Sequence, residues 1–439
     1  MSSRFSLWIY GHLMRLAKPL LRRKLQRRAH AEPLYAQHVE ERFGQYAHAA
    51  HHQWIWIHSV SLGETRTAAL LLNGLRESFP GMKLLLTQGT ATGREEGLKL
   101  LQEGDVQVWQ PWDSPEVVQR FLDAFQPRLG LVLETEVWPH WVAGAVKNKM
   151  PLVLVNARMS EKSMKQALRW PSLMQPAYAG LSAVLAQTHD DAQRLTQLGA
   201  SVKGVLGNLK FDAKPDESQT TQGRAWRGKL SQPVVMLASS REGEELLWLE
   251  AWLEFLVNHP ETKVHALVVP RHPQRVNAVE VLIQSKGFDV SRRSSWGAEG
   301  PTSASSTPST RTIWLGDSLG EMSLYYSLAD AALLGGSFER LGGQNLIEAA
   351  ACGCPIIMGP HTFNFTEAAL AAEAVGAACR AETMAEAISV SVALVHNSIE
   401  LALQSEKAKR FAQQHGGATQ RTVLAVRELL EKIKDSEGR

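Results

Sequence analysis

Residues 335–365 read GGSFERLGGQNLIEAAACGCPIIMGPHTFNF and combine glycine-rich turns with a few polar side chains. Gly342 and Gly343 precede Asn345, and an apolar helical run that carries Glu348 follows. A glycine-rich loop that leads into a helix N-terminus presents backbone N–H groups and a positive dipole to an anion. A carboxylate one turn further along can accept hydrogen bonds from ribose hydroxyls. The pattern therefore favours a site for the phosphate and ribose of a nucleotide-sugar over a turn without a ligand.

A second candidate is the acidic turn Ser61-Leu-Gly63-Glu64, which joins a predicted strand to a predicted helix. A carboxylate at such a turn can act as the general base that removes a proton from an attacking hydroxyl. A glutamate in the first turn of a helix also stabilises that helix through its dipole. The residues alone leave both interpretations of Glu64 open.

Cations that follow strands form a third group. Arg271 comes directly after a buried predicted strand, in the turn Pro-Arg-His-Pro that also holds His272, and Arg275 lies nearby. The planar guanidinium suits bidentate binding of a phosphate or a carboxylate. Two cations of the first half, Arg158 and Lys210, are further candidates for binding an anion, with plain surface charge as the alternative for each.

Short apolar strands alternate with helical segments along most of the chain, a pattern that predicts parallel sheets covered by helices on both faces. The alternation stops at the polar residues 211–232 and then resumes, so we expect an α/β chain with two Rossmann-like domains facing a central cleft. Ligands in such folds bind at the carboxyl ends of the strands. The predicted strands are residues 54–59, 82–87, 106–109, 129–133, 152–155, 184–187 and 202–204 in the first half, and 234–238, 264–269, 312–315, 331–334 and 356–358 in the second.

The predicted domain boundaries follow this alternation. We expect a basic N-terminal anchor at residues 1–45, an acceptor domain at 46–210, a linker at 211–232, a donor domain at 233–405 and a C-terminal helix at 406–439. The Ser-, Thr-, Gly- and Pro-rich residues 291–310 are predicted to form a surface loop.

The N-terminus carries an uneven share of the charge. Residues 4–28 hold eight Lys or Arg and no acid, which leaves 39 Lys and Arg against 44 Asp and Glu, a net charge of −5, in the remainder. The longest uncharged run, residues 5–14, is shorter than the roughly 20 residues of a membrane-spanning helix. A basic helix with an apolar face indicates a monotopic anchor on an anionic membrane surface, in preference to an amphipathic helix packed on the body. The apolar side chains at helical spacing are Phe5, Trp8, Ile9, Leu13, Leu16 and Leu20.

Other classes of site find little support in the composition. Three cysteines are too few for a disulfide framework, and none lies in a zinc-binding pattern. No acidic cluster of the kind that holds a metal ion is visible, so we expect no metal and no cofactor. Nucleic acid is disfavoured as a partner because the basic residues gather on one lipophilic helix without an aromatic stacking surface.

Taken together, the motifs resemble the Kdo (3-deoxy-D-manno-oct-2-ulosonic acid) transferases of lipopolysaccharide synthesis, which are GT-B glycosyltransferases. The resemblance runs from about residue 41 to residue 376. It rests on the stretches 56–64 (WIHSVSLGE), 87–93, 111–113 (PWD), 134–139 (ETEVWP), 156–158 (NAR), 207–211 (GNLKF), 239–245 (SSREGEE), 270–273 (PRHP), 316–321 (GDSLGE) and 335–365.

The resemblance implies a reaction and assigns roles. Kdo would pass from CMP-Kdo to the lipid A precursor lipid IVA at the cytoplasmic face of the inner membrane, with inversion at the anomeric carbon and without a metal ion. It identifies Glu64 as the general base and Glu136 as a second essential acid that orients substrate hydroxyls, a role compatible with a structural salt bridge to Arg158. The residues implied to bind substrate are Ser61, Gly63, Arg158, Lys210, Arg271, His272, Gly316, Leu319, Gly320, Glu321, Gly342, Gly343, Asn345 and Glu348.

The chain departs from the family's usual residues in the donor half. Ser240-Arg241 stands in place of Thr-His, Ser318-Leu319 in place of Thr-Met, and Gln344 in place of His. These departures concern the donor contacts and leave the implied reaction class unchanged. A separate alternative is another nucleotide-sugar enzyme of the same fold, such as a UDP-sugar transferase or epimerase. A non-catalytic adaptor at the membrane surface is a second alternative, against which the retained carboxylates and Arg271 count.

Overall fold

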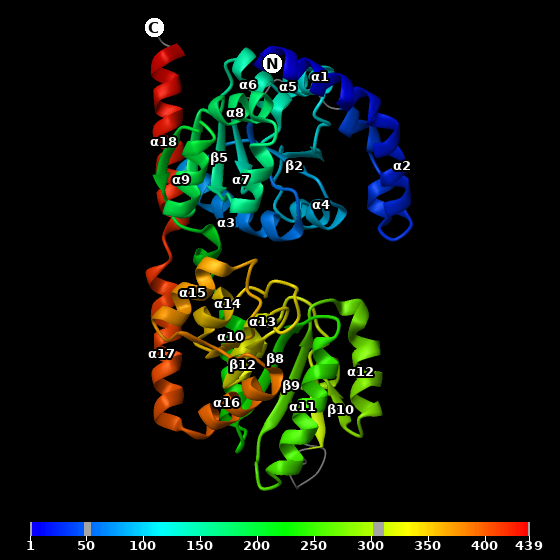
Figure 1. Ribbon diagram of the computed structural model, residues 1–439, viewed down its shortest axis with the longest axis vertical. Coiled ribbons are helices and arrows are strands. Elements are labelled where there is room, and N and C mark those ends of the chain that lie inside the picture. Colours follow the sequence, from blue (N-terminus) through cyan, green and yellow to red (C-terminus); the bar gives the residue numbers. More distant parts are fainter. Residues whose placement is uncertain (1, 48–53, 302–310, 438–439) are drawn as a thin grey trace. The chain divides into compact units, whose positions relative to one another are not determined.

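The computed structural model describes residues 2–47, 54–301 and 311–437, with side chains up to residue 432. The chain divides into two compact units (Figure 1). Unit 1 comprises Met1–Asp212 and Gly416–Arg439, and unit 2 comprises Ala213–His415.

Unit 1 is built on a seven-stranded parallel sheet in the order β3-β2-β1-β4-β5-β6-β7. This order reverses between β1 and β4, and ligands bind at such a reversal in doubly wound folds. Its central strands are buried along their whole length, as parallel strands covered on both faces must be. The strands are β1 (Ile55–His58), β2 (Leu84–Gln88), β3 (Val106–Trp109), β4 (Leu129–Leu133), β5 (Leu152–Ala157), β6 (Ala183–Ala186) and β7 (Val202–Val205).

Helices cover both faces of this sheet, and alternate residues of β1 supply the two cores. Trp56 packs with Phe121 and Trp141 on one face, whereas Ile57 packs with Leu71 on the other. The helices are α3 (Leu62–Ser78), α4 (Ala91–Leu98), α5 (Pro115–Phe125), α6 (Pro139–Lys147), α7 (Glu161–Ala167), α8 (Pro171–Ala179) and α9 (His189–Gln197), with short 3-10 turns η1 (Pro33–Ala36), η2 (Val39–Phe43) and η3 (Leu209–Asp212).

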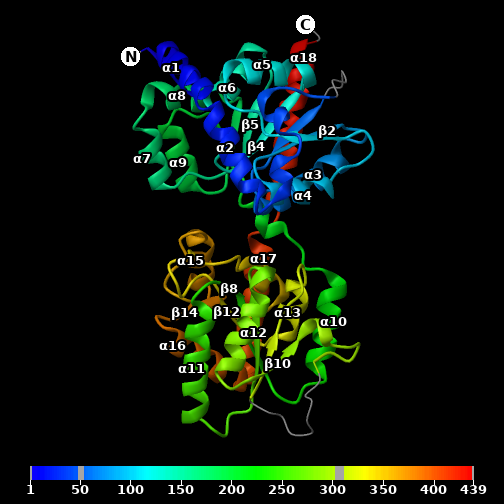
Figure 2. The ribbon, with the colours of Figure 1, turned by 90° about the vertical axis from the view of Figure 1, so that its right-hand side faces the viewer.

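The basic N-terminus forms two helices, α1 (Ser3–Leu16) and α2 (Lys18–Ala29), which run along one side of unit 1 (Figures 1 and 2). The chain bends at Ala17, one residue before the first turn of α2, which contains Pro19. Polar contacts fix α1 to the body: Ser6 and Ser172 share a hydrogen bond of 2.8 Å, and the Trp112 indole donates to the carbonyl of Met14 at 2.8 Å.

Unit 2 has a second seven-stranded parallel sheet, in the order β10-β11-β9-β8-β12-β13-β14. Its order also reverses, between β8 and β12. The strands are β8 (Val234–Ser240), β9 (His265–Pro270), β10 (Asp289–Arg292), β11 (Thr312–Leu315), β12 (Ala331–Leu334), β13 (Ile356–Met358) and β14 (Ala378–Arg380). Its helices are α10 (Glu217–Gly228), α11 (Glu244–Asn258), α12 (Val276–Ser285), α13 (Met322–Leu328), α14 (Ile347–Cys352), α15 (Thr366–Ala374), α16 (Met384–His396) and α17 (Ser398–Gln414), with 3-10 turns η4 (Pro273–Arg275) and η5 (Arg293–Ser295).

Three predicted segments differ from the structure. The expected linker is mostly helix α10, which packs so closely on α13 that a Cβ added at Gly223 would lie 2.5 Å from the Leu324 carbonyl. The expected loop 291–310 begins with the end of strand β10 and turn η5, and its residues 302–310 lie outside the described part of the chain. The expected C-terminal helix is divided between the end of α17, in unit 2, and α18 (Ala418–Glu437), which packs on α3 in unit 1.

Candidate functional site

Glu64 lies at the start of α3, directly after β1. Ser61 is the N-cap of this helix and accepts a hydrogen bond from the Glu64 backbone N–H, while the Glu64 carboxylate accepts one from the Val60 N–H at 2.6 Å. This reciprocal pattern is a variant of the capping box. Glu64 therefore stabilises the first turn of α3, which was the alternative to catalysis, and it does so through a hydrogen bond as well as its charge.

The Glu64 carboxyl has an unusually high pKa for a residue at the start of a helix. Burial raises the pKa of its carboxyl to about 7, against the Val60 hydrogen bond that lowers it, and the charges of Glu134 and Glu136 raise it further. A carboxyl with a pKa near neutrality is suited to proton transfer. β1 and β4 are neighbours at the reversal of the strand order, so these three carboxyl groups lie at the ligand-binding edge of the sheet.

Glu134 and Glu136 follow β4 and have different partners. Glu134 has a left-handed backbone (φ 59°) and accepts a hydrogen bond from Lys210 Nζ at 2.8 Å. Glu136 Oε2 accepts one from the indole of Trp138 at 2.7 Å, and burial raises the pKa of its carboxyl. The salt bridge considered between Glu136 and Arg158 is not found among the described residues. Trp138 satisfies Glu136 instead, and Arg158 contacts Glu134 only through its backbone N–H, at 3.2 Å from the carbonyl.

Asn156 at the end of β5 also organises this edge, and the sequence analysis did not single it out. It is buried with a left-handed backbone (φ 51°), and its Oδ1 accepts a hydrogen bond from the Leu209 N–H at 3.0 Å. This contact holds the segment that presents Lys210. A polar residue directly after an apolar strand was the available signal.

In unit 2, Arg271 and His272 follow β9. The Arg271 N–H donates to the Ser240 carbonyl at 2.9 Å, which joins the ends of β8 and β9. Burial lowers the pKa of His272, and the nearby guanidinium groups of Arg241 and Arg271 lower it further. Arg275, expected to support Arg271, instead forms an ion pair with the buried Glu245 at 2.7 Å.

The glycine-rich loop after β12 is held by a carboxylate that sequence reasoning missed. Glu244 is fully buried (0% exposed), and its carboxylate accepts hydrogen bonds from the N–H groups of Gly336 (2.6 Å), Phe338 (3.1 Å) and Arg241 (2.9 Å). It thus ties the turn after β8 to the loop after β12, the two strands at the reversal of this sheet. Its place in the acidic motif 239–245 was the signal.

Gly342 and Gly343 in this loop have left-handed backbones, with φ of 91° and 78°. A side chain at Gly342 would meet the side chains of Asn364 and Phe363. The Gly343 N–H donates to the Gly336 carbonyl at 2.6 Å, which closes the loop on itself. Both glycines are therefore required by the backbone, as the doubled Gly pairs in the sequence indicated.

The helix that follows this loop is short. α14 has six residues and begins at Ile347, whose N–H donates a hydrogen bond to Asn345 Oδ1 at 3.1 Å. So short a helix adds little dipole to an anion site. Glu348 and Arg271 both act electrostatically on the buried hydroxyl of Tyr326, so the structure brings these two predicted residues to the same part of unit 2.

The predicted nucleoside loop, residues 316–321, follows β11. The Gly316 N–H donates to the Val268 carbonyl at 2.9 Å, and a Cβ at Gly316 would lie 2.9 Å from the Tyr325 ring. Leu319 is 70% exposed and Gly320 has a left-handed backbone, whereas the Glu321 carboxylate accepts a hydrogen bond from Arg293 at 2.9 Å. Glu321 therefore braces the loop, and Leu319 is left open to a ligand.

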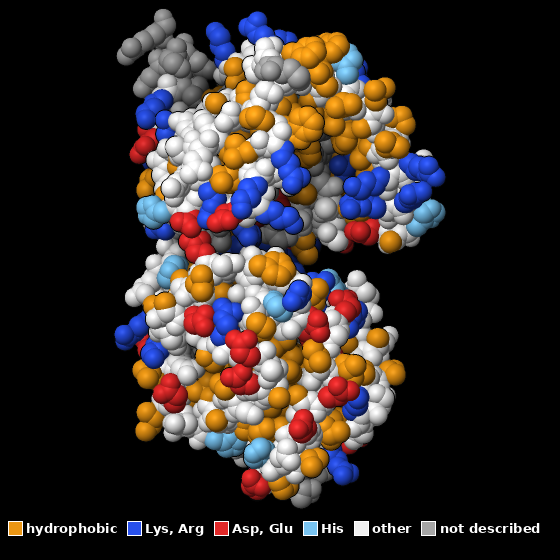
Figure 3. All heavy atoms as spheres, in the orientation of Figure 1, with side chains coloured by type: hydrophobic (Ala, Val, Ile, Leu, Met, Phe, Trp, Pro, Cys, Tyr) orange, Lys and Arg blue, Asp and Glu red, His pale blue; other side chains and the backbone are white. Residues whose placement is uncertain are grey.

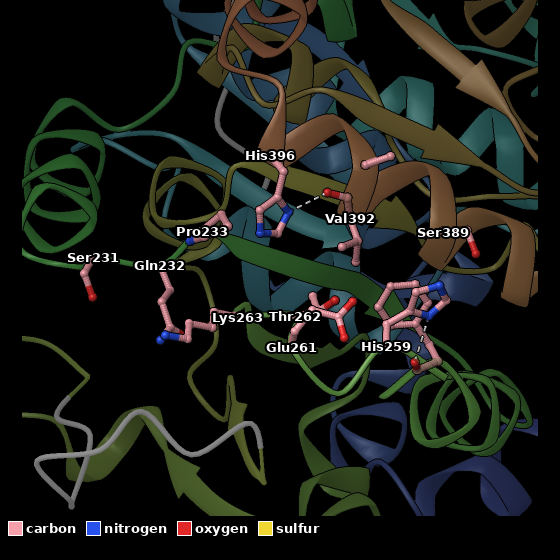
Figure 4. A pocket seen from close by; sticks show the side chains of 12 residues that line it. Ser231, Gln232, Pro233, His259, Glu261, Thr262, Lys263, Ser389, Val392 and His396 are labelled. Carbon is pink, nitrogen blue, oxygen red and sulfur yellow. Dashed lines mark hydrogen bonds between the residues drawn. The ribbon is translucent and has the colours of Figure 1, made fainter. Parts of the chain in front are cut away.

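A separate cavity of about 710 Å³ lies at the opposite edge of this sheet (Figure 4). It is lined by residues that precede β8 and β9 and by the last turns of α11 and α16. His259 and His396 point into this region, each with Nδ1 bonded to a carbonyl of its own helix, at 3.1 and 2.8 Å. None of the predicted site residues lines it. Within the described residues, no group of three or more His, Cys, Asp or Glu is placed to hold a metal ion.

The N-terminal helices expose their apolar side chains. Ser6 and Gly11 are the buried residues of α1, whereas Trp8 is 59% and Leu16 76% exposed. Figure 3 shows hydrophobic side chains gathered over α1 and Lys and Arg side chains over the far end of α2. Among the described residues no single helix is long and apolar enough to cross a membrane, although one bent pair, α16 with residues 398–432, meets that test by length and composition.

Known proteins share the sequence pattern of the first half and the overall fold of this chain. A family model described as 3-deoxy-D-manno-octulosonic-acid transferase (kdotransferase) matches residues 37–213. The solved UDP-GlcNAc 2-epimerase of Neisseria meningitidis is 14% identical, with a TM-score of 0.56 over 85% of this chain and 99% of the other. A solved glycosyltransferase of Rickettsia africae is 13% identical, with a TM-score of 0.56 over 87% and 100%. At these identities the likeness concerns the fold, and it confirms the predicted α/β class with two Rossmann-like domains.

Proteins of similar sequence identify the family, which the structural neighbours alone do not. The 3-deoxy-D-manno-octulosonic acid transferase of Bordetella pertussis is 44% identical over 383 residues, which are 86% of this chain and 87% of the relative. The transferase of the same name from Haemophilus influenzae is 30% identical over 97% of this chain and 99% of the relative. The chain therefore belongs to the family of Kdo transferases, and it is a glycosyltransferase of the GT-B fold.

Proposed function

We propose that this transferase moves Kdo from CMP-Kdo to a hydroxyl group of lipid IVA, with Glu64 as the general base. The observation that carries the proposal is the partly buried Glu64 carboxyl, whose pKa is raised to about 7 at the reversal of the unit 1 sheet. Family membership supplies the transferred sugar. The donor nucleotide, the acceptor and the residue roles are proposed on the chemistry of the two sites.

The reaction is a single displacement in which an acceptor hydroxyl oxygen attacks the anomeric carbon of Kdo. The new bond forms as the bond from that carbon to the phosphate oxygen breaks, so CMP departs with the bonding electron pair and the anomeric centre inverts. The hydroxyl proton passes to the Glu64 carboxylate. Glu136, fixed by Trp138, is suited to accept a hydrogen bond from a second acceptor hydroxyl.

Donor binding is proposed for the strand ends of unit 2. The Arg271 guanidinium is suited to the phosphate or the Kdo carboxylate, with His272 beside it. The loop of Gly342 and Gly343, held by Glu244, lets the backbone approach the nucleotide closely. Cations then stabilise the charge of the leaving phosphate, and we expect turnover to persist in EDTA.

We further propose that the enzyme is a monotopic protein on the cytoplasmic face of the inner membrane. The polar contacts of Ser6 and Met14 hold α1 with its apolar side chains outward, the reverse of an ordinary amphipathic helix on a soluble protein. The adjoining Lys and Arg side chains of α2 suit anionic lipid. An acylated acceptor that stays in the membrane requires such docking.

The test is transfer by purified protein from CMP-Kdo, generated in place, to radiolabelled lipid IVA, with and without EDTA. A product heavier by one or two Kdo units, formed equally in EDTA, supports the proposal. Failure of CMP-Kdo to react beside a working control transferase, with turnover of a UDP-sugar instead, would favour the other nucleotide-sugar reaction.

A further inference from the structure

A small cavity of about 150 Å³ lies in unit 1 between α2 and the loops that follow β2 and β3. We call it the α2 cavity. Its lining combines three cations with apolar and aromatic side chains, and Asp113 is its one acidic member among the described residues. Its lining includes Lys24, Arg28, Arg42, Leu21, Trp112 and Trp138.

Arg42 is the buried cation of this cavity, with 6% of its surface exposed. It donates a hydrogen bond to the Gly89 carbonyl at 2.9 Å, and its guanidinium carbon lies 4.0 Å from the centre of the Trp109 ring. No ion pair of Arg42 with a described carboxylate is found. The adjacent Glu41 pairs with Arg94, at 2.9 Å. A buried charge without an opposite charge is costly, so Arg42 is suited to an anion that enters from outside.

The charged groups around Arg42 do not remove this cost. Burial lowers the pKa of Arg42 to about 10; Tyr35 and Glu41 raise it in part, whereas the charges of Arg94 and Arg28 lower it further. Asp113 offsets them only in part, because burial raises the pKa of its carboxyl to about 7 and its oxygens are already engaged by the N–H groups of His140 and Trp141 at 3.3 and 3.0 Å. The α2 cavity is therefore a cationic site with room for a small anionic group.

The α2 cavity adjoins the proposed reaction centre. Gly89 accepts a hydrogen bond from Arg42 through its carbonyl and donates its own N–H to the Val60 carbonyl at 3.1 Å. The Val60 N–H in turn donates to the Glu64 carboxylate. On the other side, the Trp138 ring lines the cavity and donates to Glu136. Leu21 and Trp112 give the cavity an apolar wall next to α1, whose exposed side chains are apolar.

We propose that the α2 cavity binds a phosphate monoester carried by the acylated acceptor, with Arg42, Arg28 and Lys24 as its cationic partners. This proposal rests on the proposed function. It assigns acceptor selection to α2: an acceptor with a phosphate is held so that a hydroxyl meets Glu64, and an acceptor without one is not. Arg28 is positioned for this by a hydrogen bond to the Tyr35 hydroxyl at 3.2 Å.

The experiment compares two double variants that remove the same charge from one helix. Lys24→Gln/Arg28→Gln changes exposed cations that line the cavity, and Arg23→Gln/Arg27→Gln changes exposed cations that do not. Transfer is measured in detergent micelles, so that adhesion to a bilayer does not limit the rate, with lipid IVA and with enzymatically dephosphorylated lipid IVA. The buried Arg42→Gln is added only as a third variant, because it can fail to fold.

In Lys24→Gln/Arg28→Gln, the KM for phosphorylated acceptor should rise roughly tenfold or more while kcat stays nearly unchanged. This pattern means that the lost contacts bind the ground state and the transition state equally. The same variant should handle the dephosphorylated acceptor as the unaltered enzyme does, and Arg23→Gln/Arg27→Gln should resemble the unaltered enzyme with both. Inorganic phosphate should compete with lipid IVA in the unaltered enzyme and less in the cavity variant.

Equal losses on the two acceptors, or equal losses in the two double variants, would overturn the proposal. So would a defect of the cavity variant that appears only in flotation with vesicles containing anionic phospholipid, because these cations would then serve adhesion to lipid headgroups. Absence of transfer by the unaltered enzyme is a different outcome, which would contradict the proposed function itself.

Discussion

The Val60 backbone N–H donates a 2.6 Å hydrogen bond to the Glu64 carboxylate, so one side chain both caps α3 and occupies the ligand edge of the sheet. The two roles can be separated by substitution. Glutamine at this helical position keeps an oxygen acceptor for Val60, whereas it cannot take up a proton from a hydroxyl. Glu64→Gln should therefore lower the transfer rate about 10²- to 10⁴-fold while binding of CMP-Kdo persists. Near-normal turnover would leave Glu64 with the capping role alone.

The pH dependence of transfer follows from the raised pKa of Glu64. A general base must be ionised, so kcat/KM should fall tenfold for each pH unit below about 7 and level off above it. Glu134→Gln should move this fall of kcat/KM, the acidic limb of the pH profile, to lower pH. The reason is that the negative charge of Glu134 is one of the causes that raise the pKa of Glu64. The measurement is kcat/KM from pH 5.5 to 9 for both proteins. A limb that stays in place in Glu134→Gln would contradict this electrostatic coupling.

Ionisation of the same carboxyl, which transfer requires, should lower the stability of unit 1. The folded-state pKa of Glu64 lies above its ordinary value of 4.5, so its contribution to stability is complete below pH 4.5 and is lost as the pH rises through about 7. Glu64→Gln removes this loss, and it should raise the free energy of unfolding at pH 8.5 by up to about 3 kcal/mol while changing it little at pH 4.5. Denaturant unfolding at the two pH values measures the difference. An equal effect at both values would show that ionisation is not its cause.

The backbone of the glycine-rich loop should be intolerant of side chains. Gly342→Ala places a methyl group against Asn364 and Phe363 at a left-handed φ, and we expect a loss of about 1–3 kcal/mol in stability together with a higher KM for CMP-Kdo. Gly228→Ala is the matched control, because no atom lies within 4 Å of its added methyl group and its φ is not left-handed. Thermal unfolding and donor titration of both variants give the comparison. Unchanged donor binding in Gly342→Ala would remove this loop from the donor site.

The strands were the most predictable part of the fold. Residues 129–133, 312–315 and 331–334 have the predicted bounds, because short and mainly apolar runs in a parallel sheet leave little freedom, and residues 106–109 also have them although Gln107 interrupts the apolar run. The edge strand β10 was missed because Asp289, Ser291 and Arg292 are polar and none of its four residues is fully buried. α10 was read as a linker for a similar reason: it buries only Thr220, Gly223 and Trp226.

The positions of Glu64 and Arg271 after strands were predictable from the sequence, while their roles in the reaction stay predictions. The residues that hold the site were not predictable. Glu244 and Asn156 act through buried hydrogen bonds to backbone N–H groups that are distant in sequence, and no local spacing specifies such partners. Arg275 was expected to support Arg271, because its true partner Glu245 lies 30 residues away in the sequence. Charge inventories along a chain do not show which cations are already paired.

Membrane attachment should depend on the outward face of α1. Trp8→Glu/Leu16→Glu places two charges at positions that contact no core, so folding should be retained while flotation with anionic vesicles falls roughly tenfold or more. The control is Val257→Glu, which introduces an acid at an apolar residue of unit 2 that is 71% exposed. Raising the salt concentration should weaken the binding of the unaltered protein, because the cations of α2 add an electrostatic attraction that salt screens. Flotation of the α1 variant should be weaker at every salt concentration but should fall with salt in the same way. Flotation of Trp8→Glu/Leu16→Glu equal to that of the control would place the membrane contact elsewhere on the protein.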